Sequence, residues 1–393
     1  MVDFEEKLKE LSVSGNLRSL PDVRHDGKYI ISGESRMLNL SSNDYLGLAS
    51  DPDCRLMADF LEEAAQAGLS SETLLSSVSS RLLTGTYNVH SRLEEKLCEL
   101  SGKEAALVLS SGYHMNIGIL PAVADAGTLI LADKLVHASI IDGIRLSQAK
   151  SVRYRHQDLE RLDALVSRYS LEYSRIIIVT ESIFSMDGDV SDLKALADIK
   201  RRHPGVMLYV DEAHAVGARG ETGMGVAQEQ GVINDIDFLC GTFGKALASV
   251  GAYVLCSRTM RQYLVNRMRS LIFTTALPPL NMLWTLCVLE NLEAMSDRRE
   301  RLAANAAAVR ASLEAAGLEC PSQSHIIPVM AGGSERALDM AGEMQRKGFY
   351  LLPVRPPTVP EGTSRLRISL NAAISDSETK ALARELASSL NVF

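Results

Sequence analysis

The amino-acid sequence predicts an α/β fold with a doubly wound, mostly parallel sheet and a smaller C-terminal α+β domain. Two observations support this prediction. Short apolar, β-branched runs recur in the middle of the chain, at 105–110, 127–132, 175–182, 206–213, 235–242 and 251–257. Helix-like segments separate several of these runs, at 139–150, 158–169 and 192–203. Near-continuous apolar runs of this length are typical of strands buried on both faces, and their alternation with helices favours a parallel sheet.

A (β/α)8 barrel is the alternative, but it needs eight units, and the chain offers six or seven at uneven spacing. The pattern changes after Pro278-Pro279. From there we expect a helical stretch at 280–316, strands at 325–330, 349–354 and 364–371, and helices at 337–347 and from 375 onward. The predicted domains are a large one at 41–284, a small one at 285–393, and an N-terminal segment at 1–40 that packs on the small domain or on a partner.

Composition excludes several classes of protein. The chain has 393 residues with 49 acidic and 41 basic side chains, and this acidic balance argues against nucleic-acid binding. No apolar run is long enough to span a membrane, and the N-terminus lacks the apolar core of a secretory signal. The six cysteines lack the spacing of a metal site and are expected to be reduced thiols. We therefore expect a cytoplasmic protein without a metal.

Polar and titratable side chains follow five of the predicted strands. They stand at 110–114, at Asp133 with His137, at 181–185, at 211–214 and at 242–245. Ligands of open parallel sheets bind at the carboxyl ends of the strands. Turn formation alone favours Asn, Asp, Gly and Ser there, and it does not explain two histidines and an isolated lysine.

The segment Asp211-Glu212-Ala213-His214 also matches motif II of helicase-type ATPases. Such an enzyme needs a P-loop, G-x-x-x-x-G-K-[ST], to hold the nucleotide phosphates. Gly244-Lys245 is the one Gly-Lys pair after a predicted strand, but Leu239 stands where the first glycine is required, and Ala246 follows the lysine. The sequence therefore argues against an ATPase.

Pyridoxal phosphate chemistry uses all five strand ends. A lysine must form a Schiff base with the cofactor aldehyde, and an aspartate must pair with the pyridine nitrogen; Lys245 and Asp211 suit these two roles. His214 could bond the phenolic oxygen, and His137 could stack on the ring. Gly112-Tyr113 and Thr242 stand in turns that suit a phosphate.

Six motifs resemble those of the α-oxoamine synthases, which are fold-type I pyridoxal phosphate enzymes. They are SSNDYLGLAS (41–50), HASIIDG (137–143), TESIFSMDGD (180–189), VDEAHAVG (210–217), GTFGKA (241–246) and RPPTVPEGTSRLRISLNA (355–372). Members of this family condense an amino acid with an acyl-CoA and release CoA and, except in one branch, CO2. The resemblance runs from about residue 38 to the C-terminus. It implies a homodimer with active sites shared between subunits.

The resemblance assigns roles residue by residue. The implied catalytic residues are Lys245, His137, Asp211 and His214, with Lys245 as the Schiff-base lysine. The implied cofactor contacts also include Gly112, Tyr113, Ser185 and Thr242, and a phosphate contact from the other subunit by Thr274 or Thr275. The implied substrate contacts are Arg367 and Asn43 for the amino-acid carboxylate, and Thr358 and Arg18 for the acyl donor. Arg18 also suits a solvated surface. We expect Arg365, on the same strand as Arg367, to face the opposite side.

The substrates depend on the branch of the family. SSNDYLGL and RPPTVP…RLRISL most resemble the biotin-pathway branch, which joins L-alanine to pimeloyl-CoA or to the corresponding carrier-protein thioester. HASIIDGIRL and HIIPVM also resemble the branch that transfers acetyl from acetyl-CoA to glycine. An aminotransferase of the same fold is the remaining alternative.

One segment departs from the family pattern. Where the family has a Gly-rich turn, this chain has Ser76-Ser77-Val78-Ser79-Ser80-Arg81. Glycine adopts positive φ freely, whereas serine and especially valine do not. We therefore expect a different acyl-donor entrance, with the cofactor chemistry unaffected.

Overall fold

The computed structural model describes residues 3–51, 53–68, 70–71 and 73–390. The chain forms two compact units. The larger unit consists of Arg55–Phe184 and Val190–Arg299, and the smaller consists of Met1–Cys54, Ser185–Asp189 and Glu300–Phe393. The units change after residues 54 and 299, and the domain boundaries expected from the sequence stay a prediction.

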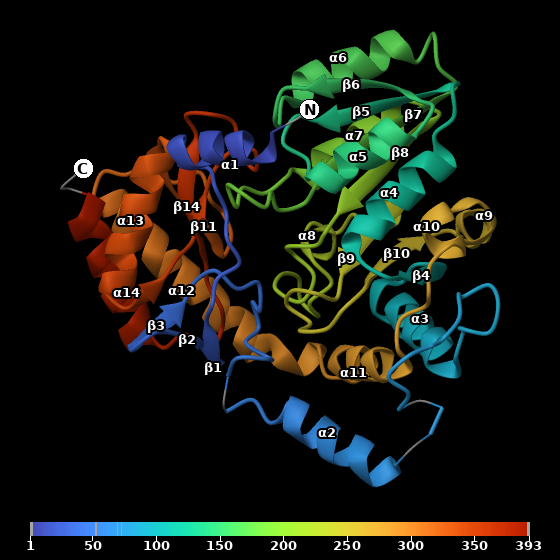
Figure 1. The fold of residues 1–393 in the computed structure, drawn as a ribbon. Helices are drawn as coiled ribbons and strands as arrows, with labels where there is room; N and C mark the ends of the chain where they lie inside the picture. The colour runs from blue at the N-terminus through green and yellow to red at the C-terminus, as the bar shows by residue number, and fades with distance from the viewer. Residues whose placement is uncertain (1–2, 52, 69, 72, 391–393) are drawn as a thin grey trace. The chain divides into compact units, whose positions relative to one another are not determined.

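The larger unit is built on one sheet, which has seven strands among the described residues (Figure 1). In spatial order they are β4 (Ala105–Leu109), β10 (Ala252–Cys256), β9 (Phe238–Thr242), β8 (Val206–Asp211), β7 (Arg175–Glu181), β5 (Thr128–Asp133) and β6 (Lys150–Tyr154). Strands β9, β8, β7, β5 and β6 pair in parallel, whereas β10 is antiparallel to both of its neighbours. The predicted α/β class with a mostly parallel sheet is confirmed.

The larger unit also contains helices, several of which pack on this sheet and bury its apolar side chains. They are α2 (Leu56–Ala67), α3 (Asn88–Ser101), α4 (Gly112–Val123), α5 (Ala138–Leu146), α6 (Leu159–Tyr169), α7 (Leu193–Arg202), α8 (Val226–Glu229), α9 (Arg258–Arg267), α10 (Arg269–Ile272) and α11 (Pro279–Glu290), with 3₁₀ turns at Ile233–Asp235 and Glu293–Met295. Side chains of α4, α5, α9 and α10 share one apolar cluster with β4, β7, β9 and β10. Strands β4, β5, β9 and β10 are buried along their whole length, as their apolar runs predict.

Two elements of this sheet differ from the sequence expectation. Helix α5 ends at Leu146, and Lys150–Tyr154 forms β6 where the predicted helix continued to residue 150. Strand β6 lies at the sheet edge and is largely exposed, so its sequence KSVRY carries no apolar run. The run at 251–257 forms β10, which runs antiparallel to β9 because residues 243–251 join these neighbouring strands without a crossover helix.

The smaller unit combines an N-terminal and a C-terminal part of the chain. One of its sheets has the order β1 (Arg24–Asp26), β2 (Tyr29–Ser32), β3 (Ser35–Asn39), β12 (Phe349–Tyr350), and the other has the order β11 (Ile326–Gly332), β14 (Ser364–Ser369), β13 (Pro353–Val354). Its helices are α1 (Phe4–Val13), α13 (Ser334–Arg346) and α14 (Asp376–Leu390), and α12 (Ser296–Ala315) begins in the larger unit. The parallel pairing of β3 with β12 joins the two parts.

Parallel pairing brings the ends of four strands to one edge of the larger sheet. Asp133, Glu181, Asp211 and Thr242 are the last residues of β5, β7, β8 and β9. Glu181 and Asp211 are direct partners across β7 and β8, so their side chains leave the sheet on the same face. The fold thus collects titratable side chains at the carboxyl edge of the sheet, where ligands of this architecture bind.

Candidate active site

A cavity of about 200 Å³ opens at this carboxyl edge. It is lined by Gly112, Tyr113, Asn116, His137, Ser139, Glu181, Asp211, Ala213, His214, Thr242 and Lys245. Seven of these eleven residues belong to the set implied by the sequence; the other four are Asn116, Ser139, Glu181 and Ala213. The larger unit therefore brings together the implied lysine, aspartate, both histidines and the phosphate-binding turns.

Lys245 and His214 are in direct contact in this cavity. Lys245 lies in the turn after β9, and its Nζ is 2.8 Å from Nε2 of His214. His214 is 5% exposed, and Lys245 is half-buried. An amine held this way at the end of a buried strand is positioned for covalent chemistry with a carbonyl group in the cavity.

The carboxylate of Asp211 is held by two donors at the end of β8. The backbone N–H of Ala213 donates to its Oδ1 (2.9 Å), and the side-chain amide of Asn116 donates to its Oδ2 (3.0 Å). Asp211 is 6% exposed. A buried carboxylate of fixed orientation suits a protonated ring nitrogen.

His137 is the N-cap residue of α5 and is exposed to the cavity. Its Nδ1 accepts from the backbone N–H of Ser139 (3.2 Å) and lies 2.7 Å from the Ser139 hydroxyl. Desolvation by the surrounding protein lowers the pKa of His137, the charge of Asp211 opposes this shift, and Lys245 lowers the pKa further. A largely neutral ring with an open face suits stacking on a flat cofactor.

Glu181 also lines the cavity. It stands among the strand-end residues, but no role for it was expected from its position in the sequence. It is 3% exposed, and burial, followed by the charge of Asp211, raises its pKa to about 8, against the effect of Lys245. Its Oε1 has no hydrogen-bond partner among the described residues. Glu181 is therefore largely protonated near neutral pH.

The N-terminus of α4 lies at the cavity. Ser111 caps this 12-residue helix by accepting from His114 N, so the backbone N–H groups of the first turn point toward the cavity end. A Cβ on Gly112 would lie 4.0 Å from the side chain of Thr242, which places the two implied phosphate contacts side by side. Tyr113, also implied, is half exposed and donates to Asp142 Oδ2 (2.9 Å).

The donor set of this cavity fits pyridoxal phosphate. Lys245 provides the amine, Asp211 the buried carboxylate for the ring nitrogen, and His214 a group beside that amine. His137 provides the open ring, and the start of α4 provides N–H donors for a dianion. Ala213 is small and lines the cavity, so it leaves room for a planar ring.

The implied carboxylate ligands lie together in the smaller unit. Arg367 on β14 donates to the backbone oxygen of Ser185 (2.5 Å) and to Asn43 Oδ1 (3.2 Å). The expectation that Arg365 faces the opposite side is wrong. Residues two apart in a strand share a face, and Arg365 pairs with Asp187, which lies two residues after Ser185.

The two implied acyl-donor contacts also meet in the smaller unit. The guanidinium of Arg18 donates to Thr358 Oγ1 (2.9 Å) and to the backbone oxygens of Arg355 (3.1 Å) and Pro356 (3.2 Å). Arg18 is exposed. Nη2 of Arg18 is thus held against the loop that carries Thr358.

Thr274 and Thr275 do not line the cavity of their own chain. Thr274 lines two other cavities, one with Arg81 and His90 and one with Phe273, and Thr275 is exposed. Their implied contact with the phosphate of a partner subunit stays a prediction.

The serine-rich segment adopts a conformation that is unusual for its residues. Val78 has φ +47°, in the left-handed region that β-branched residues rarely enter, and it is 82% exposed. The buried Ser77 hydroxyl donates to Leu277 O (2.5 Å), and Ser79 O accepts from Ala276 N (2.9 Å). Hydrogen bonds to the segment before α11 therefore hold a loop that glycines would form without strain.

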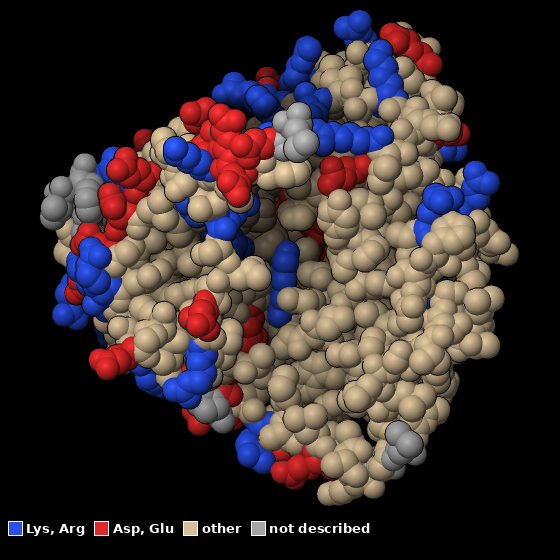
Figure 2. Space-filling model, in the orientation of Figure 1, with Lys and Arg blue, Asp and Glu red and all other residues tan. Residues whose placement is uncertain are grey.

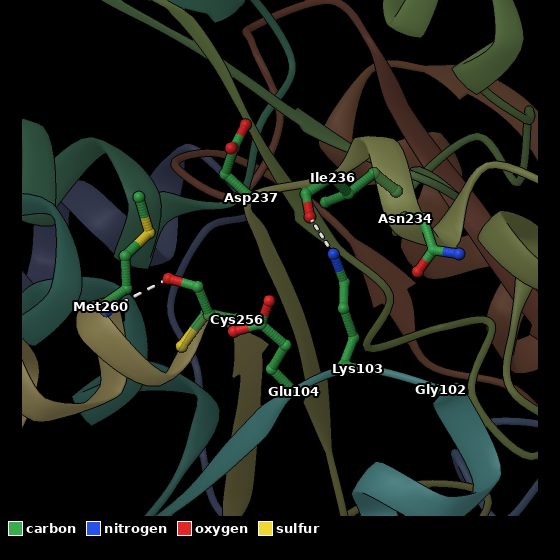
Figure 3. Close-up of a pocket in the computed structure, with 9 residues that line it drawn as sticks. Gly102, Lys103, Glu104, Asn234, Ile236, Asp237, Cys256 and Met260 are labelled. Atoms are coloured by element: carbon green, nitrogen blue, oxygen red, sulfur yellow. Dashed lines mark hydrogen bonds between the residues drawn. The ribbon is translucent and has the colours of Figure 1, made fainter.

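A second cavity, of about 340 Å³, lies at the opposite edge of the same sheet (Figure 3). Its residues precede β4 and β9 and follow β10, and they include Lys103, whose Nζ donates to the backbone oxygen of Ile236. Burial lowers the pKa of Lys103. None of the residues implied by the sequence lines this cavity, and the smaller cavity at the carboxyl edge is the candidate active site.

Comparison with known proteins decides the family. The model of the family described as aminotransferase class I and II matches residues 35–386. The chain belongs to this family. A protein of Haemophilus influenzae named "Putative 8-amino-7-oxononanoate synthase" is 49% identical over 383 residues, covering 98% of this chain and 99% of its own length. A protein of Pasteurella multocida with the same name is 49% identical over 378 residues, covering 96% of each.

Solved structures of this family agree with the fold. A serine palmitoyltransferase from S. paucimobilis, with bound PLP and myriocin, superposes with a TM-score of 0.89 at 30% identity, covering 99% of this chain and 98% of that one. An 8-amino-7-oxononanoate synthase from Francisella tularensis superposes with a TM-score of 0.75 at 28% identity, covering 91% and 98%. Both are α-oxoamine synthases, and the predicted membership in that family and its fold-type I architecture are confirmed.

Proposed function

We propose that this chain is a pyridoxal phosphate-dependent α-oxoamine synthase that joins L-alanine to a pimeloyl thioester, giving 8-amino-7-oxononanoate, CO2 and the free thiol, in biotin biosynthesis. The observation that carries the proposal is the contact of Lys245 with His214 in one cavity with the buried Asp211. The names of the relatives that are about half identical over nearly the whole chain support the choice of substrates.

The cofactor supplies an electron sink that stabilises negative charge at the α-carbon of the amino acid. Lys245 would hold the cofactor through its amine, and the same amine is the group that would take the α-proton of the amino acid. Asp211 would pair with the ring nitrogen of the cofactor, and His214 holds Nζ of Lys245 in the cavity. His137, which lines the cavity, would cover the cofactor ring and help to exclude water.

The remaining steps need groups that hold the substrates. We assign the amino-acid carboxylate to Arg367, whose fork matches a carboxylate in two hydrogen bonds. Asn43 orients that guanidinium. The new carbon–carbon bond to the thioester carbonyl replaces the bond to the thiol, and the carboxylate leaves as CO2. Lys245 would then return to the α-carbon the proton that it took at the start. Arg18 and Thr358 are assigned to the acyl donor.

The test is a substrate matrix with two readouts. The purified protein is incubated with L-alanine or glycine, each with pimeloyl-CoA, pimeloyl carrier protein or acetyl-CoA, and free thiol and product mass are followed. We expect thiol release and the mass of 8-amino-7-oxononanoate with L-alanine and a pimeloyl thioester. Lys245→Ala should abolish both signals, and Lys194→Ala, which removes an exposed lysine, should leave them unchanged.

Two other results would overturn the proposal. Turnover confined to glycine and acetyl-CoA would identify the glycine C-acetyltransferase alternative, which the HASIIDGIRL motif also resembles. Amino-group transfer to an oxo acid without thiol release would identify an aminotransferase of the same fold.

We also propose that the enzyme works as a homodimer with shared active sites. Leu75, Val78, Leu83 and Phe273 of the larger unit each expose more than 70% of their surface. The part of the face over α3 and α11 carries few charged side chains (Figure 2). Apolar side chains exposed to this extent favour burial against a second copy.

Complementation tests the shared sites. Lys245→Ala and a Thr274→Ala/Thr275→Ala variant are each expected to have little activity. If the threonines act across the dimer, subunit exchange between the two variants restores about a quarter of the native sites, because half of the dimers are mixed and each mixed dimer has one intact site. No recovery in a mixture shown to contain mixed dimers would contradict the shared site.

The described part of the chain has no helix long and apolar enough to cross a bilayer. All six cysteines are free thiols. Free thiols support our proposal that the enzyme works in a reducing compartment, the cytoplasm.

A further inference from the structure

Asn116 connects two parts of the candidate site that the sequence treats separately. It lies on α4 and is 2% exposed. Its Nδ2 is 3.0 Å from Asp211 Oδ2 and 2.8 Å from Ser139 Oγ, and its Oδ1 accepts from the hydroxyl of Tyr209. Both amide hydrogens and the amide oxygen are therefore in use, and none of them requires a bound molecule.

The direction of these hydrogen bonds is fixed by chemistry. A carboxylate only accepts, so the nitrogen of Asn116 and not its oxygen must face Asp211. The second hydrogen of the same nitrogen then points to Ser139 Oγ, which accepts it. The hydroxyl hydrogen of Ser139 is left for its other neighbour, Nδ1 of His137, at 2.7 Å.

Two donors therefore meet at Nδ1 of His137. The first is the Ser139 hydroxyl, and the second is the backbone N–H of Ser139, at 3.2 Å. A proton on Nδ1 would face both of these hydrogens. The neutral ring must accept at Nδ1 and carry its own proton on Nε2.

The charges around the His137 ring include some that raise its pKa and some that lower it. Desolvation lowers the pKa of His137, Asp211 raises it, Lys245 lowers it, and Asp142 of the same helix raises it. The net shift is downward, so the neutral form prevails near pH 7.

We propose that Asn116 and Ser139 are positioning residues, which tie the carboxylate of Asp211 to the ring of His137 and hold that ring as a hydrogen-bond donor through Nε2. The acceptor of this donor is the carbonyl oxygen of the acyl thioester, and this part rests on the proposed acyl-transfer function. An N–H of fixed direction stabilises the negative charge that the oxygen gains when carbon attacks. Asn116 thus orients Asp211 for the ring nitrogen of the cofactor and, through Ser139, orients His137 for the acyl donor.

Nitrogen NMR of the holoenzyme tests the positioning directly. Protein labelled with ¹⁵N in its histidine rings is titrated with acid, and the signals of His137 are assigned by their loss in His137→Asn. We expect a neutral ring protonated on Nε2 at pH 7. A ring protonated on Nδ1, or a doubly protonated ring at that pH, would overturn the proposal.

The variants separate positioning from general structural damage. Ser139→Ala removes one donor to the neutral form, so His137 should become protonated at higher pH than in the wild type, and kcat/KM for the acyl thioester should fall about threefold to tenfold. Ser139→Thr, which keeps the hydroxyl, should restore both values. Ser147→Ala is the matched control, because Ser147 ends the same helix and its hydroxyl donates only to Ile144 O. An unchanged His137 titration in Ser139→Ala would refute the connection.

Asn116→Ala should shift the His137 titration in the same direction and also weaken cofactor binding, because it releases both Ser139 and Asp211. Different results overturn the proposed function and the positioning roles of Asn116 and Ser139. A protein that condenses no acyl thioester overturns the proposed function and the carbonyl as the target of Nε2. The NMR result alone decides whether Asn116 and Ser139 set the state of His137.

Discussion

Glu181→Gln should change how the stability of the protein depends on pH. The folded protein raises the pKa of Glu181 to about 8, chiefly by burial and then by the charge of Asp211. In the unfolded chain the carboxyl has its ordinary pKa of about 4.5. Between these two values the folded state holds a proton that the unfolded state has released. The contribution of Glu181 to stability is therefore complete below about pH 4.5 and is lost as the pH rises toward 8.

The size of the effect follows from proton linkage. One proton bound by the folded state alone lowers the free energy of unfolding by at most about 1.4 kcal/mol for each pH unit of increase. Gln is neutral at every pH, so the variant lacks this decline. Glu212, whose pKa burial raises to about 7, acts in the same direction in both proteins. Burial lowers the pKa of His90 to about 4, so the contribution of His90 to the stability of the folded protein declines as the pH falls, again in both proteins. The difference between the two proteins isolates Glu181.

The measurement is urea unfolding of the cofactor-free protein at several pH values from about 5 to about 8. The free energy of unfolding of Glu181→Gln, relative to wild type, should rise steadily with pH. The infrared spectrum of the wild type should show a protonated-carboxyl band that the variant lacks. Glu95→Gln, at an exposed position on α3, serves as control and should follow the wild type. Parallel curves for wild type and Glu181→Gln would refute the assignment of the proton.

Three further predictions concern the site itself. Lys245→Ala should lose the absorbance above about 400 nm expected of the bound cofactor and the adduct that borohydride traps; a trapped peptide that contains another lysine would contradict the assignment. Asp211→Asn should unfold at nearly the wild-type temperature but lose about 100-fold to 10,000-fold in kcat, because an amide cannot hold the ring nitrogen protonated; near-native turnover would make Asp211 a turn residue only. Arg367→Ala should weaken L-alanine binding about tenfold to a hundredfold in a spectroscopic titration, whereas Arg365→Ala should mainly lower the melting temperature because it removes the buried ion pair with Asp187; equal losses of affinity would refute this distinction.

The strands of the larger sheet could be predicted because burial on both faces leaves a strong apolar signal. Strands β4, β5, β9 and β10 are buried along their whole length and coincide with predicted runs. The exposed edge strand β6 lacks this apolar signal. The signal also does not depend on the direction of a strand, so the antiparallel direction of β10 could not be predicted. Burial determines which residues are apolar, whereas strand direction depends on the connections between strands.

The same limit explains which site residues the sequence revealed. Lysine, aspartate and histidine at strand ends are chemically conspicuous, and Lys245, Asp211 and His214 meet in one cavity. Asn116 and Ser139 are ordinary helix residues in the sequence, and their importance comes from which atoms they face. Spacing gives no sign of that, because the contacts join α4, α5 and β8.

Arg365 and Arg367 show how partners separate two residues that sequence periodicity cannot. They lie on the same face of β14. Arg365 is 6% exposed and already pairs with the carboxylate of Asp187, so its charge is compensated within the protein. Among the described residues the acceptors of Arg367 are neutral oxygens, namely those of Ser185, Asn43, Tyr45 and Ser369. A half-buried guanidinium surrounded by neutral acceptors keeps an uncompensated charge, and an anionic ligand gains more from that charge than from a paired one. This difference in compensation, and not the face of the strand, is the physical reason to assign the amino-acid carboxylate to Arg367.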